Sequence, residues 1–403
     1  MHSAPDIIPV KERKEMLKRT MKAINDYIRS TDRVLWLLTV IAVAYGLVLI
    51  ASQQRVGGPD FLKTQIAAVC AGFVGAVVLS LIDYRLIAAL WWLAAAVSFA
   101  LTLSVFFIGI RVGGTDDVGW IRLPGGMTFQ PSELTKLCFI LTFSKHLAVS
   151  EEKGRLKSFL GVSALFLHAM LPVVMIHFQG DDGAALVFVF MFMIMSFSAG
   201  VQLRYFVLAI LGLAAAVPLV WLKILNIDQK NRLTALFSSD DEVFRSYGYQ
   251  QYQGRISIAS GGVCGKGLFH GPRVAREVVP YQENDFIFTV AGEELGYIGC
   301  LCIVLIFALM LLRLICTASK VNDPLGRNIC MGCFALIGTQ VMINLGMVLG
   351  LIPVIGITLP FFSSGGTSVF CLCLSSGLIQ SVKRYRENAL EIRFKRTVAS
   401  GGR

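Results

Sequence analysis

The chain has 403 residues, of which 55% are hydrophobic, and it carries a formal net charge of +11. Soluble domains are about 45–50% apolar even with glycine counted, so this composition and a mean hydropathy of +0.67 exclude an ordinary soluble protein. The basic residues gather at the two ends and in short loops. That distribution is typical of membrane topology and argues against a nucleic-acid partner.

Residues 1–33 form a polar, basic leader with no signal-peptide apolar core behind it, so we expect it to stay in the mature protein. Apolar residues recur in it at helical spacing: Leu17, Met21, Ile24 and Ile28. Basic residues crowd the remaining face: Lys11, Arg13, Lys14, Lys18, Arg19 and Lys22. This pattern predicts a cytoplasmic amphipathic helix that lies on an anionic leaflet.

Ten hydrophobic runs follow, each long enough to cross a bilayer, which takes about 17–25 residues. They cover residues 34–52, 62–82, 86–109, 130–149, 159–178, 183–200, 203–225, 286–316, 327–352 and 365–382. An even number of spans returns the basic tail, residues 386–403, to the side of the leader. The sequence predicts an all-α polytopic membrane protein of about ten transmembrane helices within residues 34–385, with both termini cytoplasmic.

This topology sends four segments to the extracytoplasmic side. They are residues 111–129, 179–183, 352–366 and a large loop, 226–285, between helices 7 and 8. Nearly every unusual polar residue falls on that one face, which predicts a protein that acts at the outer leaflet.

Cysteine and histidine spacing predicts neither disulfides nor a zinc site. Nine of the ten cysteines fall in apolar segments, and Cys264 alone lies in a long polar loop. None of the five histidines has a partner at metal-ligand spacing.

The acid-bearing run 280–285 passes directly into a long apolar segment. Asp285 is the last charged residue before it and should lie at the membrane boundary. Partial desolvation there favours the neutral acid and brings a carboxyl group toward base chemistry near neutral pH. Glu293 and Glu294 are expected two turns deeper, and carboxylates inside a membrane are functional candidates by default.

Glu133 and Lys136 stand at i,i+3 spacing within the fourth apolar run. They form either a local ion pair on one helix face or part of a functional site.

Several motifs stand in order along residues 34–385. They are Trp120-Ile121, Phe129-Gln130-Pro131-Ser132-Glu133 with Lys136, Gln179-Gly180-Asp181-Asp182-Gly183, Gln229-Lys230-Asn231-Arg232, Gly265-Lys266-Gly267, Asp285-Phe286-Ile287-Phe288, Glu293-Glu294-Leu295-Gly296 and Asn344-Leu345-Gly346. In this order the chain resembles the SEDS proteins, the RodA and FtsW group, which polymerise lipid-linked peptidoglycan precursors. It departs from the family at Glu283-Asn284, where His-Thr is common, at Ser364, where Tyr is common, and at Gly119, where a basic residue is frequent.

The resemblance implies a peptidoglycan glycosyltransferase that polymerises lipid II into glycan strands at the outer leaflet, by inverting transfer with Asp285 as the base. The implied catalytic residues are Asp285, Glu133, Lys136 and Asp181. The implied substrate-binding residues are Arg232, Lys266, Arg255, Gln130, Ser132, Glu293 and Ser363, of which the three bases are candidates for holding diphosphate. Asp181 binds a divalent cation (Mg or Mn), positions an arginine or supports Asp285, and the sequence does not choose among these roles.

The resemblance also implies partners: polyprenyl-diphosphate-linked glycan, a class B penicillin-binding transpeptidase and other proteins of the cell-wall synthesis complex. Elongation, division and sporulation roles are not distinguished. Two alternatives stand beside the polymerase. One is a lipid II flippase, disfavoured because no inverted repeat is visible, and the other is a scaffold that recruits cell-wall proteins, which leaves Asp285 unexplained.

Overall fold

The computed structural model describes residues 10–54, 61–112, 117–123, 128–225, 227–237 and 248–400. Parts of the predicted leader (1–9), the large loop (226 and 238–247) and the tail (401–403) lie outside the described residues. Most of the described chain is helical, as the sequence predicts.

Seven helices are long and apolar enough to cross a membrane among the described residues. They are α2 (Arg33–Gln53), α3 (Phe61–Leu81), α5 (Trp91–Ile108), α7 (Phe159–His177), α9 (Leu203–Leu219, continued by the π-helical turn η3, Val220–Ile224), α14 (Ile287–Ala318) and α15 (Pro324–Val348). Backbone groups have no water to bind in hydrocarbon, so apolar runs of this length become helices.

Three further helices coincide with the remaining predicted runs. They are α6 (Pro131–Glu152), α8 (Asp182–Ser198) and α16 (Gly366–Ser400). The first carries several charged residues, among them Glu133 and Lys136, and the second is short, at 17 residues. The predicted count of ten spans therefore stays a prediction.

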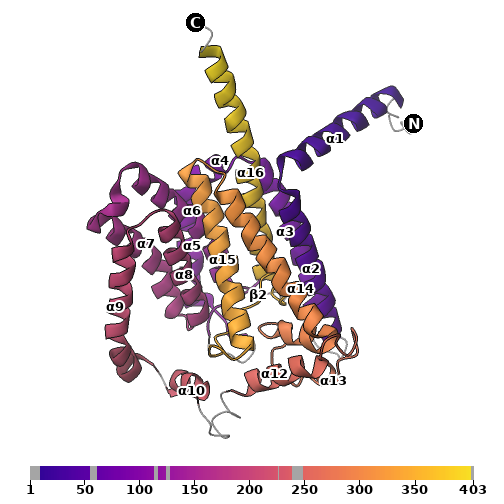
Figure 1. Ribbon diagram of the computed structural model, residues 1–403, viewed down its shortest axis with the longest axis vertical. Coiled ribbons are helices and arrows are strands. Elements are labelled where there is room, and N and C mark those ends of the chain that lie inside the picture. Colours follow the sequence, from indigo (N-terminus) through magenta and orange to yellow (C-terminus); the bar gives the residue numbers. More distant parts are fainter. Residues whose placement is uncertain are drawn as a thin grey trace, which may run out of the picture.

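The long helices form one bundle with two distinct ends (Figure 1). Short helices gather at one of them, which we call the loop end: α10 (Ile227–Ala235), α12 (Tyr249–Gly261) and α13 (Pro272–Ala275). The hairpin of β1 (Ile121–Arg122) and β2 (Thr128–Phe129) precedes α6. At the opposite end lie the two termini, where α1 (Val10–Ser30) and the last turns of α16 project beyond the bundle, with α4 (Tyr84–Ala89) between α3 and α5.

The centre of the bundle is α15. Most of its apolar window is buried, and it packs against α6, α8, α14 and α16. A helix that is apolar on every side suits such a position. By contrast α9 has no buried residue and stands apart from the bundle (Figure 1).

Helix α14 is interrupted at Gly296, whose φ of 67° and ψ of −160° are not helical. The chain that connects α12 to α13 enters this break. The amide of Tyr297 donates to the carbonyl of Gly262 (2.9 Å), and the amide of Lys266 donates to the carbonyl of Glu293 (3.0 Å). The inserted loop thus supplies partners for backbone groups that the break separates from the helical ladder.

Candidate active site

Asp285 lies at the loop end, two residues before α14. The side-chain amide of Asn344, on the central helix α15, donates to the carbonyl of Asp285 (2.8 Å) and to that of Ile357 (2.6 Å). Asn344 is fully buried, so its amide ties both segments to the core. The sequence contains Asn344 in a motif but gave it no role, because the contact joins residues 59 positions apart.

The surroundings of the Asp285 carboxyl group favour its neutral form. Burial raises its pKa from 3.8 to about 7, and the nearby carboxylates of Glu283, Asp181 and Asp117 act in the same direction. The residue as a whole keeps an intermediate exposure, although its carboxyl group is enclosed. The direction of the shift agrees with the sequence-based expectation, and the role of base stays a prediction.

Asp181 joins the starts of two helices. It caps α8, where one carboxylate oxygen accepts the amide of Ala184 (2.8 Å), and the other oxygen accepts the side-chain amide of Gln130 (3.1 Å), the residue before α6. Burial raises the pKa of Asp181, while Lys136 opposes that rise. Gln130 thus contacts Asp181, whose carboxyl group lies close enough to raise the pKa of Asp285, and a shared catalytic role stays a prediction.

The pair Glu133 and Lys136 is buried in the first turns of α6. The Lys136 Nζ lies 2.6 Å from Glu133 Oε1, and both side chains are almost fully enclosed. Both charges lie close enough to affect the Asp181 carboxyl group. The pair is therefore part of the site's surroundings as well as a local ion pair.

The two predicted serines occupy different settings. The Ser363 hydroxyl donates to the carbonyl of Asn284 (2.5 Å) and accepts the amide of Leu359 (2.8 Å), so it holds the segment before Asp285 in place. The Ser132 hydroxyl is buried and has no hydrogen-bond partner among the described residues. Substrate binding by either residue stays a prediction.

The three predicted diphosphate-binding bases lie on separate loop-end segments. Lys266 pairs with Glu293 (3.3 Å), Arg255 is exposed on α12 near Gly350, where α15 ends, and Arg232 is exposed on α10. Within the described parts of the chain, no hydrogen bond or ion pair joins any of them to Asp285. Their convergence on a substrate stays a prediction.

Glu293 differs from the sequence-based expectation of a substrate-binding residue. It is fully buried, and its carboxylate accepts the amides of Arg273 (2.9 Å) and Val274 (3.0 Å) besides pairing with Lys266. The hydrogen-bond and ion-pair partners of its carboxylate all belong to the segment between α12 and α14, which packs on α14. Glu293 therefore anchors this loop, because a carboxylate enclosed by backbone donors has no open side for a substrate.

Glu293 and Glu294 lie about two turns into α14, beyond Asp285, and their depth in a membrane stays a prediction. Glu294 accepts the hydroxyl of Ser52 (2.6 Å), one residue before the end of α2, and the amide of Phe269 (3.1 Å). The turns before Gly296 therefore pack against the end of α2 and the loop between α12 and α13.

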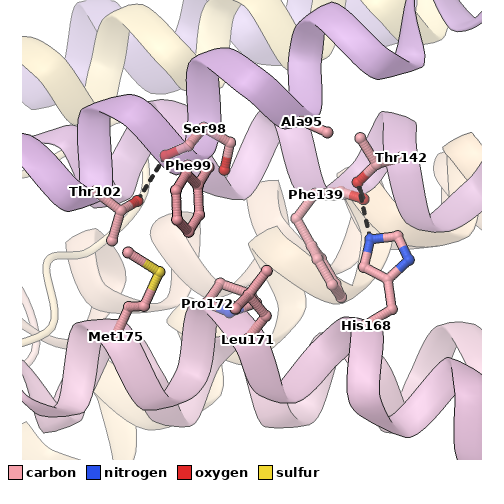
Figure 2. Close-up of a pocket in the computed structure, with 10 residues that line it drawn as sticks. All are labelled: Ala95, Ser98, Phe99, Thr102, Phe139, Thr142, His168, Leu171, Pro172 and Met175. Carbon is pink, nitrogen blue, oxygen red and sulfur yellow. Dashed lines mark hydrogen bonds between the residues drawn. The ribbon is translucent and has the colours of Figure 1, made fainter.

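A cavity of about 70 Å³ lies elsewhere, between α5, α6 and α7 (Figure 2). Its lining is mostly apolar, and His168 reaches the hydroxyl of Thr142 across it (3.2 Å). Neither Asp285 nor Asp181 lines it. The candidate site is therefore the carboxylate set at the loop end.

The described residues hold no group of three or more histidine, cysteine, aspartate or glutamate side chains that could bind a metal ion. Asp285 and Asp181 interact electrostatically but do not make a complete ligand set. The structure provides no metal centre from the described side chains alone.

Fold and site together define a polytopic helical membrane protein with a carboxylate-centred site at one end of its bundle. A family model described as "Cell cycle protein", of the FtsW, RodA and SpoVE group, matches residues 31–388. The chain belongs to this family. It is similar to a probable peptidoglycan glycosyltransferase FtsW of Geobacter metallireducens, at 32% identity over 91% of this chain and 96% of that one.

Other relatives agree. The peptidoglycan glycosyltransferase MrdB of Escherichia coli K12 is 27% identical over 88% of this chain and 94% of its own. A solved peptidoglycan synthase complex, described as coordinating polymerization and crosslinking, contains a chain that matches with a TM-score of 0.75 at 27% identity, over 88% of this chain and 98% of that one. The rod shape determining protein RodA of Thermus thermophilus matches with a TM-score of 0.65 at 26% identity, over 88% and 97%.

Proposed function

We propose that this protein is a peptidoglycan glycosyltransferase that polymerises lipid II into glycan strands. The observation that carries the proposal is the Asp285 carboxyl group at the loop end, whose pKa of about 7 suits a general base. The relatives named peptidoglycan glycosyltransferases, matched over nearly their whole lengths, support the substrate class.

The geometry supports a single displacement. Asp285 takes the proton of a sugar hydroxyl, the hydroxyl oxygen bonds to the anomeric carbon of a second lipid-linked sugar, and the polyprenyl diphosphate leaves with the bonding electrons. No enzyme nucleophile takes part, so the anomeric configuration inverts. Arg232, Lys266 and Arg255 are the candidate cations for the departing diphosphate.

The proposal includes a topology with ten spans: the seven apolar helices together with α6, α8 and α16. The loop end faces the outside, and both termini are cytoplasmic. Two features support this arrangement. The termini lie at the end of the bundle opposite the loop helices (Figure 1), and basic residues are concentrated at the terminal end, as the positive-inside rule requires.

The proposed partner is a class B penicillin-binding transpeptidase, with other cell-wall synthesis proteins around the pair. The similarity to a chain of a solved peptidoglycan synthase complex supports this partner. The proposal allows a divalent cation (Mg or Mn) bound by Asp181 or Asp285, with oxygen atoms of the substrate as its remaining ligands. No step above depends on this cation.

The test is polymerisation by the purified protein. Labelled lipid II in detergent micelles should give a ladder of glycan products on a gel, with and without the transpeptidase partner. An Asp285→Asn preparation controls for contaminating polymerases. Micelles have no two compartments, so transport has no meaning there; if no product forms even with the partner added, the flippase becomes the better reading.

A further inference from the structure

Asp182, the residue after Asp181, holds two other elements in place. One carboxylate oxygen lies 2.5 Å from His177 Nδ1, at the end of α7. The other oxygen accepts the side-chain amide of Gln229 on α10 (2.8 Å). A single side chain thus joins the end of α7, the start of α8 and the separate helix α10.

The hydrogen bond between Gln229 and Asp182 also orients Arg232. Arg232 follows it by three residues on α10, and residues at i and i+3 share one face of a helix. The hydrogen bond to Asp182 therefore turns the Arg232 face of α10 toward the start of α8, where Asp181 lies. Arg232 itself is exposed and available to an anion.

Helix α10 depends on such a link because it is short and poorly buried. It has nine residues, fewer than the about 12–15 at which isolated helices become marginally stable. Of its residues whose burial is described, Ala235 alone is buried. Packing alone thus contributes little to its position, and polar contacts orient it.

We propose that Asp182 is a positioning residue, which holds α10 through Gln229 so that Arg232 faces the carboxylate site and binds the diphosphate of the lipid-linked substrate. The proposal rests on the proposed function. Asp182 itself touches neither substrate nor reacting atoms. Loss of the link should weaken substrate binding and leave the chemistry at Asp285 unchanged.

Three variants test this in the purified full-length protein: Asp182→Ala, Gln229→Ala and Arg232→Ala. We expect each to lower kcat/KM for lipid II about three- to tenfold, while the midpoint of the pH profile, which reports Asp285, stays at the wild-type value. Because all three act through one contact, the double variants should be no worse than the worst single variant. Asp182→Asn, which keeps an acceptor for Gln229, should recover part of the loss.

The matched control is Thr234→Ala on the same helix. Thr234 is exposed, and its hydroxyl bonds only to carbonyls within α10 (3.1 Å to each) in the described structure. Its kcat/KM should stay at the wild-type value. Multiplicative effects in the double variants, or a shifted pH midpoint in the single variants, would overturn the proposal.

Amide hydrogen exchange supplies a readout independent of activity. Residues 227–235 should exchange faster in Asp182→Ala and in Gln229→Ala than in the wild type, with no substrate present. Unchanged protection in both variants would refute the link. If the wild type makes no glycan, the proposed function fails, but hydrogen exchange still decides whether Asp182 holds α10. If Asp182→Ala does not fold, Gln229→Ala tests the same hydrogen bond from its other partner.

Discussion

At the scale of single residues, Asp285→Asn should abolish glycan synthesis. The substitution keeps the shape of the side chain and removes its ability to accept a proton. The measurement is glycan product per amount of folded protein, with Glu277→Gln, an exposed carboxylate of the same end, as the control. Substantial activity in the Asn variant would rule out Asp285 as the base.

The pH dependence of the wild type should follow the same group. With the pKa of Asp285 raised to about 7, the base form is scarce at pH 5.5 and dominant at pH 8. We expect kcat/KM for lipid II to rise about tenfold or more between these values, with its midpoint near pH 7. A flat profile across this range would contradict the assignment.

Stability should respond to pH in the opposite sense. The folded pKa of Asp285 is raised, so the native state binds the proton more tightly than the unfolded chain, and ionisation between pH 4 and 7 costs stability. Asp285→Asn, which cannot ionise, should have a higher Tm than the wild type at pH 8. The difference should shrink as the pH falls through 7, and a Tm gap independent of pH would contradict the shift.

The buried pair in α6 gives a prediction about charge compensation. Lys136→Met leaves the Glu133 carboxylate buried without its 2.6 Å partner, and breaking one side of such a pair costs about 3–5 kcal/mol. Adding Glu133→Gln should recover most of that stability. Thermal unfolding in detergent measures this recovery. A double variant that is stable yet inactive would show that the pair serves catalysis. A double variant less stable than Lys136→Met would contradict the compensation.

At the scale of elements, the break in α14 depends on Gly296. A Cβ there would lie 2.3 Å from the amide nitrogen of Gly265 and 2.6 Å from the carbonyl of Val263, at a φ of +67°. Gly296→Ala should therefore displace the inserted loop and lower the Tm by several degrees. Thermal unfolding and protease cleavage near residue 265 measure this effect.

The matched control lies in α9. A Cβ on Gly212 meets nothing within 4 Å, so Gly212→Ala should be neutral or stabilising by up to about 1 kcal/mol, the helix propensity difference. Equal behaviour of the two alanine variants would show that the loop does not depend on the break.

At the scale of the whole molecule, the topology predicts which cysteine is accessible from outside. Cys264 is exposed at the loop end between α12 and α13, whereas Cys316 is exposed in the last turn of α14 near the opposite end. A membrane-impermeant maleimide should label Cys264 in intact protoplasts, and Cys316 should stay unlabelled. Labelling of Cys264 only after the membrane is broken would invert the topology and place the carboxylate site in the cytoplasm.

The sequence by itself determined the class of protein and the positions of the long helices, and it singled out Asp285 and Asp181 as candidates for the site. Apolar length and the order of charged residues are local properties, and a bilayer leaves a long apolar run little choice but a helix. These features could therefore be predicted without any knowledge of contacts. The motif order further placed the chain in its family, which the family model over residues 31–388 confirms.

Only the tertiary structure decided which polar groups meet. Gln130 reaches Asp181 across 51 positions and Asn344 reaches Asp285 across 59, and no local pattern encodes such pairings. The same holds for Glu293 and Glu294, whose spacing in an apolar run predicted intramembrane carboxylates. The break at Gly296 admits a loop from about 30 residues earlier, and the Lys266 amide of this loop donates to the Glu293 carbonyl. Backbone donors of the same loop enclose the Glu293 carboxylate. The predicted substrate-binding residue is therefore a structural anchor.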